Sequence, residues 1–121
     1  MEQTQKITIK KTDPKDLNKI MVFEKRNSEF IQQYSRTQHL ELLKSGGHFS
    51  IFKRANNKLV GHIILVLDNK KREAIEFRRI VISEKGLGYG SDSIKLIKKI
   101  CLKNYKTKKI WLDIYSDKKS N

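Results

Sequence analysis

The stretch EFRRIVISEKGLGYGSDSIKLIKKICLKNY, residues 76–105, decides the fold because two hydrophobic periods meet in it. Its first part, residues 77–83, includes three consecutive β-branched side chains and favours a buried strand. Three of the six glycines of the chain follow within residues 86–90. The last part carries apolar residues at helical spacing, which form one stripe: Ile94, Ile97, Ile100 and Cys101. The stretch therefore predicts a strand, a glycine turn and a helix, in that order.

The glycine turn is a candidate phosphate site. Glycine permits positive φ and lets a ligand approach the main chain closely, and a helix that opens just after it presents unpaired N–H groups and a positive dipole end. A P-loop would need Gly-Lys-Ser/Thr at its end, which is absent. A dinucleotide fingerprint would need Gly-x-Gly-x-x-Gly, and residues 86–90 are one residue short of it. Residues 109–113 nevertheless read as a following strand that ends in an acid, so this interpretation stays open beside that of a purely structural turn.

A third interpretation fits best, because Lys85-Gly86-Leu87-Gly88-Tyr89-Gly90 resembles the Gln/Arg-x-x-Gly-x-Gly/Ala signature of the GNAT superfamily, the acyl-CoA-dependent N-acetyltransferases. Lys85 stands in the Gln/Arg place, which keeps a cation and loses the forked guanidinium. The similarity extends to residues 79–82, like the strand before the signature, and to residues 110–115, like the strand after the helix. The residues of this motif are most similar to those of the branch that includes the ribosomal-protein alanine acetyltransferases. The resemblance implies transfer of an acetyl group from acetyl-CoA to a primary amine of unknown identity.

The resemblance also implies where acetyl-CoA would lie. The pantetheine would pair with main-chain groups of the strand that ends at Ile82-Ser83, and the pyrophosphate would rest on amides of the turn and of the helix start. The implied cofactor contacts are Ile80, Val81, Ile82, Lys85, Gly86, Gly88, Tyr89, Gly90 and Ser91.

Acetyl transfer needs a neutral amine, so a carboxylate or a water chain must accept the amine's proton. Glu76 is our candidate catalytic base, because it stands at the start of the strand that would carry the cofactor, where the superfamily often places an acid. Glu76 is equally well explained as a solvated partner of Arg78 or of a lysine. Glu24 and His62 are weaker candidates for the same role.

Length and composition indicate one globular domain, residues 1–121, with 37% hydrophobic and 33% charged residues. The formal net charge of +14, from 27 Lys and Arg against 13 Asp and Glu, favours a polyanionic partner such as CoA, a nucleic acid or a ribosome. Lysines spread along the whole chain are also explained by plain solvation of the surface.

No apolar run approaches the roughly 18 residues of a membrane span, and no secretory signal is visible. We therefore expect a cytoplasmic protein without a membrane partner.

Cysteine and histidine give no sign of a metal. The single Cys101 falls on the apolar stripe of a helix, which is typical of a buried structural thiol. His39, His48 and His62 lie far apart in the sequence, without partners at ligand spacing. We expect no metal site.

Helices are expected in two further places. Asp13-Pro14 offers a cap and a first-turn proline, and the inner face of that helix would hold Leu17, Ile20, Met21 and Phe23 or Glu24. One or two helical segments should follow, ending at residues 44–47. In the superfamily this region often shapes the acceptor pocket, so Phe30 and Tyr34 are candidate substrate contacts, although aromatic residues at helical spacing are more typical of a core.

Strands are expected at residues 5–11, 48–53, 58–67, 74–83 and 109–115, with turns at 55–57 and 68–71. Leu59-Val60-Gly61 also resembles the recurring Leu-Val-Gly of the superfamily, where glycine tolerates a bend or close backbone contact. The order of elements predicts an α/β fold: a mixed, mainly antiparallel sheet with one parallel strand-helix-strand crossover.

The C-terminal end departs from the superfamily pattern. Members commonly continue with an Asn-x-x-Ala segment, a helix whose tyrosine can protonate the thiolate, and a closing hairpin, whereas here residues 116–121 end the sequence. We therefore expect a domain that lacks its C-terminal strands, weak turnover, and an exposed sheet edge that is covered in a homodimer. The alternative function is a non-catalytic basic module that binds CoA or nucleic acid, for which the sequence offers no known nucleic-acid motif.

Overall fold

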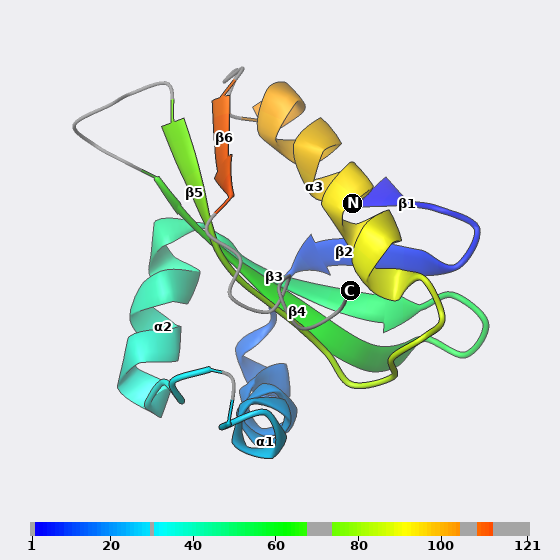
Figure 1. Cartoon of the computed structure of the whole chain (residues 1–121). Helices are drawn as coiled ribbons and strands as arrows, with labels where there is room; N and C mark the ends of the chain where they lie inside the picture. The colour runs from blue at the N-terminus through cyan, green and yellow to red at the C-terminus, as the bar shows by residue number, and fades with distance from the viewer. Residues whose placement is uncertain (1, 30, 68–73, 105–108, 113–121) are drawn as a thin grey trace.

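The computed structural model describes residues 2–29, 31–67, 74–104 and 109–112, which form a six-stranded sheet with helices on both faces (Figure 1). The strands lie in the order in which they occur in the chain. Their bounds are β1 Glu2–Gln3, β2 Ile7–Lys11, β3 His48–Lys53, β4 Lys58–Leu67, β5 Ala74–Ile82 and β6 Lys109–Leu112. All neighbours are antiparallel except β5 and β6, which run parallel and are connected through α3 (Tyr89–Asn104). This arrangement confirms the predicted mixed sheet with one crossover.

The first helix begins where the sequence predicts it. The Asp13 carboxylate accepts a hydrogen bond from the Lys15 backbone N–H at 3.0 Å, which caps a 3-10 turn, η1 (Pro14–Asp16), that leads into α1 (Leu17–Arg26). The inner face is close to the expected one, because Leu17, Ile20, Phe23 and Glu24 are all buried, whereas Met21 is only half-buried.

The second helix, α2 (Arg36–Ser45), is shorter than the region expected to be helical. A capping box fixes its start, because the Ser35 hydroxyl accepts from the Gln38 N–H at 3.1 Å and the Gln38 side chain accepts from the Ser35 N–H at 2.8 Å. Gly46, with φ of 85°, ends the helix as predicted. Tyr34 therefore lies in the loop before α2 and not on a helix face, while Phe30 lies outside the described residues.

The central strands carry two features that bear on the site. A Cβ at Gly61 would lie 2.3 Å from the Val81 carbonyl oxygen, so the glycine permits the close strand contact expected for Leu59-Val60-Gly61. In β5, Arg79 pairs with Ile64 and Phe77 pairs with Leu65, which leaves Arg78 in a bulge without a partner on β4.

Two apolar clusters cover opposite faces of the sheet. α3 packs over one face and contributes Ile97, Ile100 and Cys101 to the larger cluster. α1 covers the other face, where its inner residues meet Val81 and Leu59. Cys101 is fully buried, and burial raises the pKa of its thiol to about 11, so the prediction of a buried structural thiol is confirmed.

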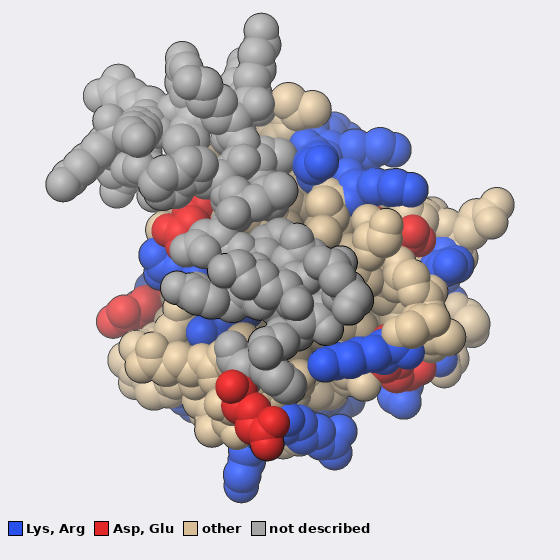
Figure 2. All heavy atoms as spheres, viewed as in Figure 1, with Lys and Arg blue, Asp and Glu red and all other residues tan. Residues whose placement is uncertain are grey.

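The visible surface carries more basic than acidic side chains, drawn blue and red in Figure 2. Four exposed lysines lie on α3, at positions that share its outer face: Lys95, Lys98, Lys99 and Lys103. Asp92 is the one acid in this helix, so its outer face presents a row of positive charge.

Some predicted features lie outside the described residues, namely the turn at residues 68–71, the end of the last strand at residues 113–115, and the tail. The homodimer that we expect from the sheet edge stays a prediction. Among the helices in the described ranges, none is long and apolar enough to cross a membrane.

Candidate functional site

Part of one edge of β5 has no strand partner among the residues that the structure describes. Within the described ranges, β6 pairs with β5 only from Ala74 to Phe77, whereas β5 stays paired with β4 up to Ile82. Main-chain N–H and C=O groups on the other edge of residues 78–82, here called the open edge of β5, therefore have no strand partner among the described residues. Such an edge can pair with an extended ligand.

The glycine turn, residues 83–88, leads from this open edge to α3. Its first residue, Ser83, donates to the Val60 carbonyl from its backbone N–H at 2.7 Å and from its hydroxyl at 3.0 Å. Gly86 and Gly88 both have φ of +80°, which side chains rarely adopt. Gly90 does not share this conformation, and a Cβ added there would meet nothing within 4 Å. Two glycines are therefore required by the backbone of the turn, while the third leaves open space at the helix start.

The start of α3 is held in place by a buried side chain and by hydrogen bonds. Tyr89 is buried in the core, and the Asp92 N–H donates to the Gly88 carbonyl at 3.1 Å. The Asp92 carboxylate accepts from the Thr4 hydroxyl at 2.7 Å. The remaining amide donors of the first turn and the dipole of a 16-residue helix suit an anion.

Lys6 is a candidate residue that the sequence analysis missed. Its ammonium donates to the Leu87 carbonyl at 3.2 Å, so a cation from the N-terminal hairpin reaches the glycine turn. Nothing in the local sequence around Lys6 signals this contact, because it depends on how β1 and β2 pack beside α3.

The predicted cofactor residues lie along the open edge of β5 and the glycine turn. Ile80 and Val81 bury their side chains in opposite apolar clusters, so only their main chain is available, as the resemblance implies. Tyr89 is likewise available only through its main chain. Lys85, Gly86, Gly88 and Ser91 are exposed. Their role as cofactor contacts remains a prediction.

Glu76, the predicted base, is paired with Arg78. Its carboxylate accepts from the Arg78 Nε at 3.0 Å and from Nη2 at 3.2 Å, and the two side chains are 23% and 38% exposed. The ion pair that we considered as the alternative explanation of Glu76 is thus present. The catalytic role of Glu76 stays a prediction.

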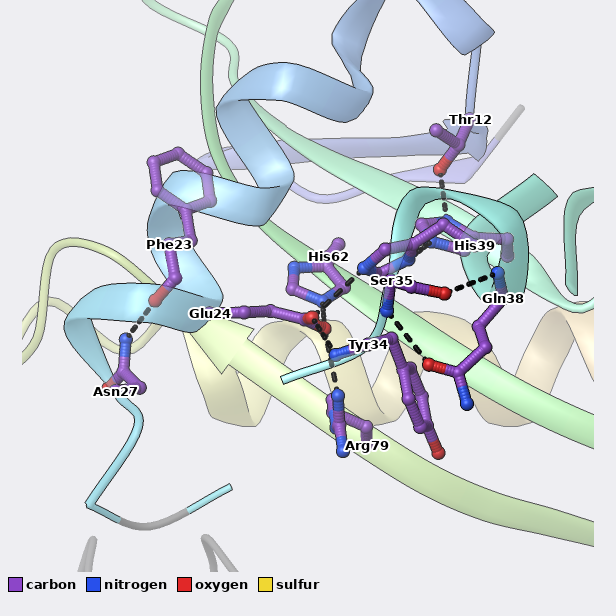
Figure 3. Close-up of polar contacts among 11 residues, drawn as sticks. Thr12, Phe23, Glu24, Asn27, Tyr34, Ser35, Gln38, His39, His62 and Arg79 are labelled. Atoms are coloured by element: carbon purple, nitrogen blue, oxygen red, sulfur yellow. Dashed lines mark hydrogen bonds and ion pairs between the residues drawn. The ribbon is translucent and has the colours of Figure 1, made fainter. Parts of the chain in front are cut away.

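A buried polar cluster lies between the sheet and the two helices α1 and α2 (Figure 3). It joins five side chains, each at most 8% exposed. They are Glu24 of α1, His39 of α2, His48 of β3, His62 of β4 and Arg79 of β5, here called the Glu24 cluster. The weaker base candidates Glu24 and His62 are therefore in direct contact.

The Glu24 carboxylate is the centre of this cluster. Its Oε1 accepts from His39 Nε2 at 2.9 Å and from the Tyr34 backbone N–H at 3.1 Å. Its Oε2 accepts from His62 Nε2 at 2.9 Å and from Arg79 Nη1 at 2.9 Å.

A hydrogen-bonded chain continues from His39 towards β2. His39 Nδ1 lies 3.0 Å from His48 Nε2, and His48 Nδ1 lies 2.8 Å from the Thr12 hydroxyl. Thr12 in turn lies 2.7 Å from the Ser50 hydroxyl. Five side chains of the interior are therefore joined in one polar chain that begins at Glu24.

Burial and mutual contact shift the protonation of these groups. Burial raises the pKa of the Glu24 carboxyl, but the hydrogen bonds from His39 and His62 outweigh it, so that pKa lies well below its usual range. Burial lowers the pKa of His48 to about 3. Burial also lowers the pKa of His62, against the opposing effect of Glu24. At neutral pH the cluster therefore contains an ionised Glu24 carboxylate and neutral His48 and His62 imidazoles.

The register of β3 and β4 explains how distant histidines come together. His62 pairs with Ser50, and His48 pairs with Ile64, so His48 and His62 share one face of the sheet because alternate residues of a strand point the same way. Sequence spacing alone did not predict this, since the partners lie on different elements.

Within the described ranges, no group of three or more His, Cys, Asp or Glu side chains could hold a metal ion.

Tyr34 lies over the Glu24 cluster, as Figure 3 shows. The Arg79 guanidinium carbon is 4.0 Å from the centroid of the Tyr34 ring, and the His39 ring meets the same ring edge-on at 5.8 Å. The pKa of Arg78 is raised chiefly by its hydrogen bond to Glu76, with a smaller effect from Tyr34. Tyr34 therefore neighbours both arginines, which follow the part of β5 that pairs with the described residues of β6.

Comparison with known proteins identifies the fold. No protein-family model and no curated protein matches the sequence. A ribosomal-protein-alanine N-acetyltransferase from Brucella melitensis matches with a TM-score of 0.67 and 14% identity, over 91% of this chain and 81% of that one. A spermidine N-acetyltransferase mutant from Vibrio cholerae matches with a TM-score of 0.68 and 21% identity, over 90% and 70%. A Mycobacterium tuberculosis protein solved in complex with CoA matches with a TM-score of 0.67 and 13% identity, over 87% and 63%. The chain therefore has the fold of the GNAT-family acetyltransferases.

Proposed function

We propose that the protein is an N-acetyltransferase that transfers an acetyl group from acetyl-CoA to a primary amine. The observation that carries this proposal is the open edge of β5, which leads directly into a turn with two positive-φ glycines and then into a helix start. An extended pantetheine can pair with such an edge, and amides at a helix start can hold a pyrophosphate. The fold, shared with acetyltransferases, supports the same function.

The proposed cofactor runs from the turn back along β5. Its pyrophosphate lies on the main-chain amides of residues 86–91, with the ammonium groups of Lys6 and Lys85 nearby. Its pantetheine pairs with the open edge of β5. The acetyl group then lies beside Arg78 and Arg79, which are the first residues of β5 beyond its pairing with the described residues of β6.

The proposed reaction is direct transfer. The amine nitrogen attacks the thioester carbonyl carbon while its proton passes to a base, the C–S bond breaks, and the leaving thiolate takes up a proton. Glu76 is the proposed base, because it lies on β5 two residues before Arg78, beside which we place the acetyl group. Although Arg78 occupies both of its oxygens, each carboxylate oxygen has a second lone pair for the amine proton.

The acceptor that we favour is an amino-acid or peptide amine. A chain with a formal net charge of +14 repels a polycation, so a polyamine is the weaker choice even though one of the structural neighbours is a spermidine N-acetyltransferase. A second candidate function, binding of a nucleic acid, is favoured by the row of exposed lysines on α3. Saturable binding of acetyl-CoA, set against salt-sensitive binding of random DNA, distinguishes the two functions.

Gly90→Ala tests the cofactor site without straining the fold. The added methyl group meets nothing in the protein, and alanine favours a helix over glycine by up to about 1 kcal/mol, so stability should hold or rise slightly. We expect the affinity for acetyl-CoA, measured by calorimetry, to fall about tenfold or more, because the methyl group fills space that the pyrophosphate needs.

Gly88→Ala is the matched comparison. It places a side chain at φ of +80°, which costs about 1–2 kcal/mol, so this variant should lose stability as well as affinity. An unchanged Kd in folded Gly90→Ala protein would remove the turn from the proposed site.

A further inference from the structure

The hydrogen bonds to Glu24 use every acceptor position of its carboxylate. An ionised carboxylate offers about four lone-pair sites, and here four donors occupy them, two on each oxygen. The donors come from the loop before α2, from α2, from β4 and from β5. One side chain of α1 therefore fixes four other segments.

These contacts determine where two of the histidines carry a proton. A carboxylate only accepts, so His39 and His62 are protonated on Nε2. His39 Nδ1 then lies 3.0 Å from His48 Nε2, and His48 Nδ1 lies 2.8 Å from the Thr12 hydroxyl. His62 Nδ1 has no hydrogen-bond partner in the part of the chain that the structure describes.

The four donors differ in whether they can become acceptors. An imidazole can move its proton to the other nitrogen and become an acceptor, whereas a backbone N–H and a guanidinium can only donate. Each oxygen of Glu24 receives one donor of each kind: Tyr34 N–H on one side and Arg79 on the other. A neutral amide in this place would point its own NH₂ group at one of these two fixed donors.

Stability alone does not require a buried carboxylate at this position. Apolar residues of similar volume hold helices on a sheet as well as a buried ion pair does, and often better. What the ionic cluster adds is a fixed direction for each partner. Its two fixed partners, Tyr34 and Arg79, lie beside the part of β5 that follows its pairing with the described residues of β6.

We propose that Glu24 is the positioning residue of the acceptor side: its carboxylate holds the Arg79 guanidinium against the Tyr34 ring and ties the loop before α2 to β5, so that the amine meets the acetyl group in one geometry. This inference rests on the proposed function, because it takes the acetyl group to lie beside Arg78 and Arg79. Glu24 does not touch the reacting atoms and acts through its partners.

The test compares Glu24→Gln with Glu41→Gln, an exposed carboxylate on α2 outside the cluster. Calorimetry measures the Kd for acetyl-CoA, and thiol release at saturating acetyl-CoA measures kcat/KM for an alanine-initiated peptide amide. We expect both variants to bind acetyl-CoA within about twofold of wild type, and only Glu24→Gln to lose about tenfold or more in kcat/KM, because small misplacements of reacting groups cost up to about 100-fold. Arg79→Lys keeps the charge, shortens its reach to Glu24, and should show the same separation of binding from turnover.

Histidine-selective ¹⁵N labelling adds a readout that needs no substrate. The chain has three histidines, so NMR reports the protonated nitrogen of each ring directly, and we expect a proton on Nε2 of His39 and of His62, the two nitrogens that face Glu24. The proposal is overturned if Glu24→Gln and Glu41→Gln have equal kcat/KM, or if either of these two nitrogens carries no proton. Failure of the wild-type protein to bind acetyl-CoA would count against the proposed function instead, and the ring forms would then decide whether the Glu24 hydrogen-bond arrangement stands.

Discussion

Lys6 adds charge to a turn that belongs to a distant part of the chain. Its ammonium is held at the Leu87 carbonyl, and a Cβ added at Gly88 would come within 3.0 Å of it. The lysine therefore stands beside the glycine whose positive φ shapes the turn, at the place where we propose the pyrophosphate.

Lys6→Gln should weaken acetyl-CoA binding by a few-fold. An exposed ion contact is worth about 0.2–1 kcal/mol, and salt screens it, so the effect should shrink between low and high ionic strength. Calorimetry at two salt concentrations measures both. Lys15→Gln, which removes an exposed lysine from η1, is the control for net charge, and equal Kd values in the two variants would show that Lys6 makes no contact with the cofactor.

At the scale of single elements, α2 is unusual in the contacts that hold it to the sheet. His39 is its one buried residue, and Leu40 is 37% exposed. A helix in a domain of this size is normally held by an apolar stripe. Here polar contacts of His39 with Glu24 and His48 carry much of that role.

His39→Ala should loosen α2 selectively. Removing one partner from a buried ionic network typically costs about 3–5 kcal/mol, because the groups left behind lose their hydrogen bonds. We expect hydrogen exchange to quicken in the amides of α2 well before those of β4. Leu40→Ala, on the exposed side of the same helix, should change stability by no more than about 0.5 kcal/mol; a similar loss in both variants would contradict the idea that His39 anchors the helix.

Secondary structure could be predicted from the sequence where its signal is local, and it could not where it depends on contacts between distant residues. The bounds of β3 and β4 were predicted correctly, because turn-forming residues separate two β-rich runs. The glycine turn was recognisable within six residues, because its signal is local. The start of α2 was not predicted, because Tyr34, which was counted with the helical residues, lies in the loop before the capping box of Ser35 and Gln38. The Glu24 cluster was missed as well, since it depends on strand register and helix docking, which no spacing along the chain records.

The whole molecule contains groups whose protonation differs between the folded and unfolded chain. An unfolded histidine titrates near 6.5, whereas the pKa of His48 in the fold is about 3 and that of His62 is also lowered. Below pH 6.5 the unfolded chain therefore binds more protons than the fold, and stability falls as pH falls. The lowered pKa of Glu24 acts in the same direction, with its contribution complete above 4.5 and lost below it.

Urea unfolding at pH 7.5, 6.5 and 5.5 measures this effect. Each buried histidine that stays neutral lowers the free energy of unfolding by about 1.4 kcal/mol per pH unit once the pH is below the unfolded value. We expect stability to change little between pH 7.5 and 6.5 and to drop clearly by pH 5.5. His48→Gln should reduce that slope, and a flat profile in the wild-type protein would mean that these histidines are not held neutral.

Burial of two histidines also limits how the charge of the molecule responds to acidity. Exposed carboxylates titrate below about pH 5 and lysines above about pH 9, and burial lowers the pKa values of His48 and His62, which would normally lie between them. These two imidazoles therefore add no positive charge to the folded protein between about pH 5.5 and 7. Within that interval, ionic strength more than acidity would govern the attraction of the surface for polyanions.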